Sequence, residues 1–108
     1  VFKYSPEPGT SAAGFPDQVP EKVKTARMHE LLAAQAAVVD SLNAGLVGKK
    51  FEVLMDSPRF GRTYRDAPEI DGTVETAAGP GGKKPRPGDL VKVLITSARG
   101  YRRKGRLV

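Results

Sequence analysis

"GKKFEVLMD", residues 48–56, marks the place where the sequence changes from a helical to an alternating pattern of apolar residues. Phe51, Val53 and Met55 fall on one face of an extended strand, and charged residues lie between them on the other face. The alternation predicts a strand with one buried and one exposed side. It indicates that a β domain begins at this point of the chain.

Four further short strands are predicted downstream, separated by turns that contain glycine or proline. In one of them Val91, Val93 and Ile95 would face inward. Five strands in about sixty residues favour a small OB-like antiparallel barrel, because closure removes the exposed strand edges. We therefore expect a mainly β fold over residues 46–108. The predicted strands after the first are residues 60–65, 72–76, 90–96 and 102–108.

A long loop is predicted between the third and fourth of these strands, at residues 77–88. Seven of its twelve residues are glycine or proline, so we expect it to be mobile. Its stretch "GPGGKK" is followed by neither serine nor threonine and has no strand-to-helix context. It is therefore not a phosphate-binding fingerprint.

Upstream of the barrel, the sequence predicts one helix from Pro20 to Ala44. Proline suits the first helical position, and Glu21 suits the positive end of the helix dipole. Apolar side chains recur at three- and four-residue steps, and the stop follows at Gly45. We interpret residues 20–45 as a linker whose apolar stripe packs on a neighbouring domain. The stripe consists of Met28, Leu31, Val38 and Leu42.

Residues 1–19 are interpreted as the remnant of a larger domain. They open on the apolar run "VFKY" without a methionine, and three prolines within them, followed by Pro20, exclude regular helix and any central strand. We expect that the chain was cut from a longer protein. Detached from it, this segment should be disordered or held by non-native contacts.

The composition excludes several classes of function. Cysteine is absent, so the chain offers no disulfide and no thiolate ligand. It has neither a secretion signal nor an apolar run of the ~20 residues that a membrane span needs, and a cytoplasmic location is the expectation. His29 is the only histidine and lacks the partners of a metal site or a catalytic triad. We expect this chain alone to bind no cofactor or metal and to catalyse nothing.

The positive charge of the chain is concentrated in the barrel. The net charge is +6, and residues 46–108 hold 14 basic but only 7 acidic residues. Such a cluster could neutralise phosphates while a base stacks on its interleaved tyrosine, but a solvated basic surface is an equal alternative. The candidate RNA contacts are Lys83, Lys84, Arg86, Arg99, Tyr101, Arg102, Arg103, Lys104 and Arg106.

Nearly the whole sequence resembles one known family. Residues 4–35, "YSPEPGTSAAGFPDQVPEKVKTARMHELLAAQ", look like the segment that closes the radical SAM barrel of methylthiotransferases and leads by a helix into their C-terminal TRAM domain. "GLVGKKFEVLMD", "GRTYRDAPEIDGTV" and "KPRPGDLVKVLIT" are similar to successive strands of that domain. The resemblance assigns residues 1–19 to the end of the radical SAM domain, 20–45 to the linker helix and 46–108 to the TRAM domain.

Two motifs resemble the branch of this family that modifies a ribosomal protein, called RimO. "YSPE" followed by "GT" is found in that branch, whereas the tRNA-modifying members usually carry arginine at the position of Glu7. "GRTYRDAPEIDG", residues 61–72, closely resembles the RimO signature within the TRAM domain. The ending "YRRKGRLV" departs from the acidic ending common in the branch, which adds RNA contact by the last strand as an expectation.

The resemblance implies a whole enzyme that inserts a methylthio group on the β-carbon of an aspartate in small-subunit ribosomal protein twelve. Such enzymes use two iron–sulfur clusters and S-adenosylmethionine, which supply the radical chemistry. The cysteines that hold the clusters lie upstream in the family. The resemblance therefore implies no cofactor in this chain.

Residues 61–72 are the candidate surface that reads the substrate protein. Arginines offer planar forks, tyrosine offers a rigid contact, and the carboxylates are acceptors for a basic partner, with Pro68 stiffening the turn. Two alternatives stay open: a turn held by internal carboxylate-to-backbone bonds, and an RNA-binding TRAM module of a tRNA methylthiotransferase. The candidate substrate contacts are Arg62, Tyr64, Arg65, Asp66, Glu69 and Asp71.

Overall fold

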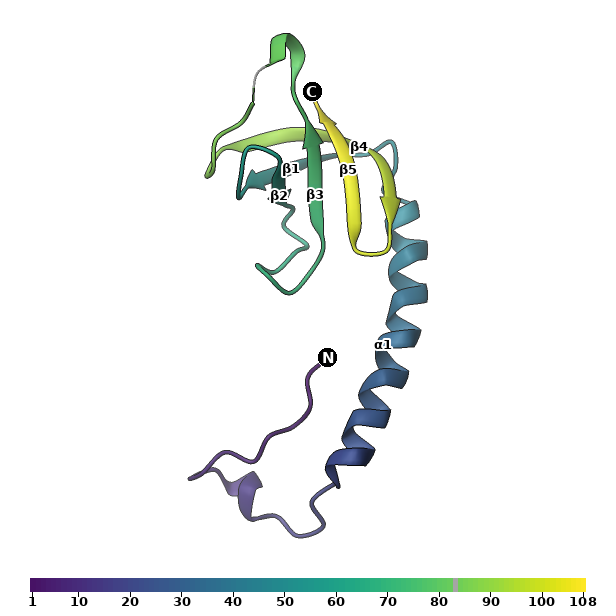
Figure 1. Ribbon diagram of the computed structural model, residues 1–108, viewed down its shortest axis with the longest axis vertical. Coiled ribbons are helices and arrows are strands. Elements are labelled where there is room, and N and C mark those ends of the chain that lie inside the picture. Colours follow the sequence, from purple (N-terminus) through teal and green to yellow (C-terminus); the bar gives the residue numbers. More distant parts are fainter. Residues whose placement is uncertain (83) are drawn as a thin grey trace. The chain divides into compact units, whose positions relative to one another are not determined.

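The computed structural model describes residues 1–82 and 84–108 (Figure 1). Contacts divide the chain into two compact units, Val1–Ala37 and Val38–Val108. Helix α1, Glu21–Ala44, confirms the predicted helix. It begins one residue later than expected, because Pro20 contributes only its carbonyl, which accepts the N–H of Lys24 at 3.1 Å.

The first unit holds the N-terminal segment, which includes the short 3-10 helix η1, Ser11–Gly14. Lys3 and Lys24 both form ion pairs with Glu21 at the start of α1. The Lys24 Nζ also donates to the carbonyl oxygen of Tyr4 at 2.9 Å. Helix α1, which the structure describes over its full length, has no buried residue.

The second unit contains a closed five-stranded barrel with the strand order β1-β2-β3-β5-β4 (Figure 1). The predicted barrel is thus confirmed, and four of its five strand pairings are antiparallel as expected. The pairing of β3 with β5 is parallel. A closed ring with an odd number of strands must contain at least one parallel pair, since directions cannot alternate all the way round. The strands are β1 Lys50–Met55, β2 Phe60–Arg62, β3 Thr73–Ala77, β4 Leu90–Arg99 and β5 Arg102–Leu107.

Two strands differ in length from their predictions by three residues each, and β5 ends one residue early. β2 ends at Arg62 because Thr63 begins a turn, in which its carbonyl accepts the N–H of Asp66 at 3.0 Å. β4 continues to Arg99, and a register shift after Ile95 keeps it paired with β5. The predicted loop between β3 and β4 contains a short 3-10 turn, η2. η2 comprises Pro80–Gly82.

The barrel core confirms the inward positions predicted from the alternation. Its fully buried side chains come from β1, β3 and β4, and half-buried Phe51, Val91 and Leu107 pack against them. On β5, a Cβ at Gly105 would lie 2.3 Å from Cγ1 of Val93, so a glycine is needed where this strand crosses the core. The fully buried residues are Val53, Met55, Val74, Val93 and Ile95.

The last turn of α1 is tied to the hairpin between β4 and β5. Asp40 Oδ1 accepts the backbone N–H of Gly100 at 2.7 Å, and Asn43 Nδ2 donates to the Gly100 carbonyl at 2.7 Å. Leu46, just after the helix, is buried. Residues 38–47 are therefore part of the barrel unit and fix the position of the hairpin tip.

Candidate functional site

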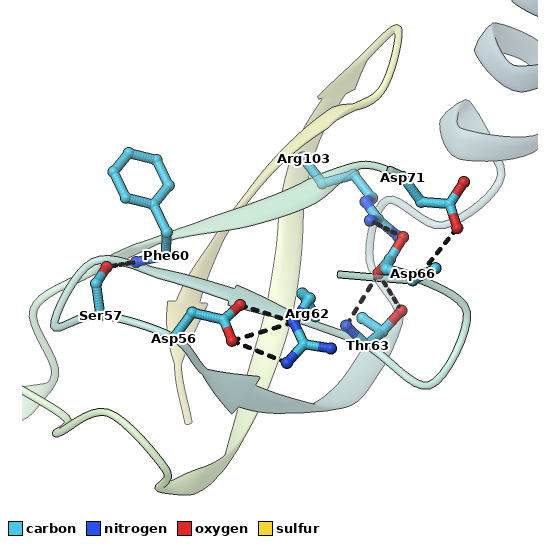
Figure 2. A network of polar contacts seen from close by, with 9 residues as sticks. Asp56, Ser57, Phe60, Arg62, Thr63, Asp66, Asp71 and Arg103 are labelled. Atoms are coloured by element: carbon cyan, nitrogen blue, oxygen red, sulfur yellow. Dashed lines mark hydrogen bonds and ion pairs between the residues drawn. The ribbon is translucent and has the colours of Figure 1, made fainter. Parts of the chain in front are cut away.

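The loop that joins β2 to β3, residues 63–72, is organised around Asp66; we call it the signature loop. Asp66 Oδ2 accepts the backbone N–H of Thr63 at 2.9 Å and the Thr63 hydroxyl at 2.6 Å. Asp66 Oδ1 lies 2.5 Å from Nη2 of Arg103 on β5 (Figure 2). Both carboxylate oxygens are therefore occupied within the barrel unit.

The ion pair between Asp66 and Arg103 is buried. The exposed fractions of the two side chains are 6% and 4%. Asp66 was a predicted substrate contact and Arg103 a predicted RNA contact, but burial removes both from the side chains available to a partner. Within the described part of the chain the Arg103 Nε has no hydrogen-bond acceptor, whereas the Arg103 Nη2 donates to Asp66 Oδ1.

The second half of the signature loop is also held from within. Asp71 Oδ2 accepts the N–H of Ala67 at 2.8 Å, and the Asp71 N–H donates to the Ala67 carbonyl at 3.2 Å. Glu69, between them, has a positive φ of 62°. A Cβ at Gly72 would lie 2.0 Å from the carbonyl oxygen of Tyr101, so only glycine fits where the loop passes the hairpin. The sequence left open that this turn is held by internal carboxylate-to-backbone bonds, and Asp66 and Asp71 both form such bonds.

The remaining signature residues point their side chains to solvent from this fixed backbone. Tyr64 is 89% exposed, and Arg65 and Glu69 are exposed as well. The backbone N–H of Arg65 donates to the Thr63 hydroxyl at 3.3 Å, which connects it to the Asp66 network. Ile70 is 65% exposed, and we did not predict it as a contact. The signal in the sequence was that Ile70 is the one large aliphatic residue in residues 63–72.

Arg62, the last residue of β2, is occupied by an acidic neighbour. Its Nε and Nη2 donate to the two carboxylate oxygens of Asp56, each at 2.9 Å (Figure 2). These hydrogen bonds raise the pKa of Arg62 above its ordinary value. In the turn between β1 and β2, the N–H of Phe60 donates to the Ser57 hydroxyl at 3.0 Å. A partner would have to compete with Asp56 for this guanidinium.

The predicted RNA contacts fall on two exposed segments, apart from buried Arg103. Lys84 and Arg86 lie in the loop before β4, while Lys83 lies outside the described residues. The others belong to β5 and the hairpin that precedes it. These are Arg99, Tyr101, Arg102, Lys104 and Arg106.

At the hairpin, Arg99 of β4 lies directly opposite Arg102 of β5. Neither forms an ion pair with a carboxylate among the residues that the structure describes. Like charges at directly opposite positions destabilise a sheet. Lys104, further along β5, forms a long ion pair with Glu75, with 3.8 Å between Nζ and Oε2.

In residues 1–82 and 84–108 there is no group of three or more metal-ligating His, Cys, Asp or Glu side chains. Since the sequence contains no cysteine, it supplies no thiolate for an iron–sulfur cluster. No helix in the described ranges is long and apolar enough to cross a membrane.

Comparison with known proteins agrees with the fold. A sequence profile of the TRAM domain family matches residues 47–108. The chain is 50% identical over its whole length to "Ribosomal protein uS12 methylthiotransferase RimO" of Elusimicrobium minutum and covers 24% of that protein. Proteins of the same name from Moorella thermoacetica and a Synechococcus species are 41% and 38% identical, over 89% and 100% of this chain.

The chain spans 21% to 24% of the length of these relatives. The profile match covers all five strands of the barrel. The similarity to the relatives extends further, through the helix and the N-terminal segment. The chain therefore belongs to the TRAM domain family and corresponds to the TRAM region of RimO-type methylthiotransferases.

Proposed function

We propose that this chain is the substrate-recognition region of a radical SAM methylthiotransferase that modifies an aspartate of ribosomal protein uS12. The names of the relatives supply the reaction and the substrate. We assign recognition to the signature loop because the hydrogen bonds and the ion pair of Asp66 hold the backbone next to Tyr64 and Arg65 in place. A loop already ordered in the free protein loses less conformational entropy when it binds.

The exposed part of the signature loop has the chemistry of a protein-binding surface. Tyr64 offers a large amphipathic ring with few rotatable bonds, and Arg65 offers a planar fork for carbonyl or carboxylate oxygens. Glu69 is an acceptor for basic side chains and would repel phosphates. This mixed set suits a basic ribosomal protein better than an RNA backbone.

The cofactors of the proposed enzyme would lie outside these residues. The family implies two iron–sulfur clusters and S-adenosylmethionine, and the cluster ligands must come from other residues because this chain has no cysteine. We assign residues 1–19 to the end of the radical SAM domain, 20–45 to a linker helix and 46–108 to the TRAM domain. The contribution of this chain to the reaction is to bind and orient the substrate protein.

The test is modification of uS12 by the full-length protein with Tyr64→Ala or Arg65→Ala. Each substitution should weaken productive binding by about 1–3 kcal/mol if the side chain is a central contact, and should leave cleavage of S-adenosylmethionine intact. Lys50→Ala is a matched control, since it removes an exposed basic side chain of β1 that belongs to neither the signature loop nor the candidate RNA contacts. Unchanged modification by both loop variants would refute the assignment.

A second candidate function is RNA contact by the β4–β5 hairpin. The observation that favours it is the direct pairing of Arg99 with Arg102 without a carboxylate partner among the described residues, beside exposed Tyr101. An RNA phosphate would relieve the repulsion between the two guanidinium groups. Arg99→Glu and Arg102→Glu should then weaken binding of an RNA oligonucleotide. The logarithmic salt slope should fall by roughly one unit for each phosphate that is no longer neutralised.

A further inference from the structure

We infer that a groove beside the signature loop receives a large apolar side chain of the substrate protein, flanked by a basic residue. The inference rests on the proposed function and adds a specificity subsite to it. The groove has a volume of about 330 Å³ and lies on the outer face of the barrel. Its apolar lining comes from Leu54 of β1, Leu90 of β4 and Tyr64 of the signature loop.

The two leucines of the groove are neighbours on adjacent strands of the barrel. Leu54 is directly opposite Leu90 on one side and directly opposite Arg62 on the other. Leu54 is 39% exposed and Leu90 is 63% exposed, although both occupy regular strand positions. Exposed leucines side by side on a barrel surface, next to an 89% exposed tyrosine, indicate an interaction site rather than a solvated face.

The charges around the groove argue against phosphate as its occupant. Arg62 is engaged by Asp56, and Asp66 is engaged by Arg103. Among the described residues that line the groove, no cation is therefore left without an acidic partner. A phosphate would have no unpaired cation to bind in this groove, and it would contact apolar surface. An apolar side chain would displace water from both leucines.

A basic residue beside that apolar side chain is favoured by Glu52. This exposed residue of β1 lines the groove, and its carboxylate has no ion-pair partner among the described residues, although Lys92 is opposite it in β4. Glu69 on the signature loop is exposed and likewise unpaired in the described structure. The barrel half of the chain has an excess of positive charge, so these two carboxylates mark where a basic protein can approach.

The volume of the groove is large enough for one side chain of a partner. About 330 Å³ is at the lower end of the size of ligand pockets and accommodates one large aliphatic or aromatic group. The backbone at the Tyr64 end of the groove is ordered, because Thr63 is buried and bonded to Asp66. That end of the groove therefore needs no ordering of the loop backbone when a partner binds.

The test is binding of free uS12 to the 108-residue chain by titration calorimetry, with Leu90→Ser and Leu54→Thr. Each variant should weaken binding about tenfold or more, since each removes most of a buried leucine contact. Val47→Ser is the matched control, because Val47 is a similarly exposed apolar residue outside the groove. Thermal unfolding shows whether each variant is folded. If Leu54→Thr is unstable, the test rests on Leu90→Ser, because Leu90 is the more exposed of the two leucines.

A peptide series identifies the occupant. Overlapping uS12 peptides should bind best where a large apolar residue is next to lysine or arginine, and replacing that apolar residue by serine should cost about tenfold. The same replacement should cost almost nothing with Leu90→Ser, because the two changes remove one and the same interaction. Additive effects in this cycle would overturn the inference.

The outcomes separate the subsite from the proposed function. If Tyr64→Ala and Arg65→Ala weaken uS12 binding but both leucine variants bind as tightly as the unaltered chain, the subsite is wrong and the proposed function stands. If neither set has an effect, or uS12 does not bind at all, both are wrong. Loss of RNA binding rather than uS12 binding in Leu90→Ser would assign the groove to nucleic acid instead.

Discussion

Arg103 of β5 and Asp66 of the signature loop, 37 residues apart in the sequence, meet through a buried contact of 2.5 Å between Nη2 and Oδ1. The pair connects the last strand of the barrel to the loop that carries the exposed Tyr64. The Asp66 carboxylate also accepts the backbone N–H and the hydroxyl of Thr63. A single ion pair therefore links the barrel to the surface proposed for recognition.

Removing the arginine of this pair should be costly. Arg103→Met leaves the Asp66 carboxylate buried and uncompensated, which typically destabilises a protein by about 3–5 kcal/mol. Denaturant unfolding of the chain measures the loss. Arg102→Met, one residue away on the exposed side of the same strand, should change the free energy of unfolding by no more than about 0.5 kcal/mol.

The double variant Asp66→Leu with Arg103→Met separates stability from loop order. Because both buried charges are gone, most of the lost stability should return, while the N–H of Thr63 loses its acceptor. Amide exchange should then show a protected barrel and a rapidly exchanging signature loop. Losses that simply add in the double variant would show that the two side chains do not act as a pair.

Gly72→Ala should disturb the passage of the signature loop over the hairpin. The added methyl would lie 2.0 Å from the carbonyl oxygen of Tyr101, so the backbone of one of the two segments must move. We expect a loss of about 1–3 kcal/mol in the free energy of unfolding. Gly14→Ala is the control, because it has no atom within 4 Å of the added group and its φ is not positive. Equal effects at both positions would contradict the close approach.

Glu21 reports on the N-terminal segment. Hydrogen bonds from Lys3 and Lys24 lower the pKa of this carboxyl from 4.5 to about 2. A depressed folded-state pKa means that the contact contributes its full stabilisation above about pH 4.5 and loses it as the pH falls towards 2. An NMR titration should show this low pKa, and Lys3→Ala should raise it towards 4.5.

The sequence-based prediction is that residues 1–19, once detached, are disordered or held by non-native contacts, and the same titration tests the first of these two alternatives. If they are disordered, Lys3 spends little time near Glu21, and Lys3→Ala should leave the titration of Glu21 unchanged. The structure shows the contact, so a shift on mutation is the expected result. Lys22→Ala is the control, since Lys22 forms no ion pair with Glu21 in the described structure.

Much of the fold was predictable because its signals are local. Alternating residues such as Val53 and Val93 located strands and their buried faces, and the apolar repeat located the helix. The parallel pairing of β3 with β5 was missed, although closure of five strands requires it. Strand ends were missed where a turn or a register shift intervened, as at Thr63 and after Ile95.

The candidate site was less predictable because its key contact is long-range. The alternation of the last strand, with Gly105 and Leu107 facing inward, also places Arg103 inward, but the run of charges indicated a solvated or RNA-binding surface. No local pattern shows that Asp66 is its partner. The internal bonds of Asp71 with Ala67 are local, and the sequence did suggest carboxylate-to-backbone bonds as an alternative.

The central claim, that the signature loop reads the substrate protein, is tested most directly by site-specific photo-cross-linking. The full-length protein would carry p-benzoylphenylalanine in place of Tyr64, and in a second preparation in place of Tyr101, and would be irradiated with small ribosomal subunits. The account predicts a cross-link to uS12 from position 64 and none to uS12 from position 101. Cross-links from position 64 to ribosomal RNA alone, or uS12 cross-links only from position 101, would contradict it.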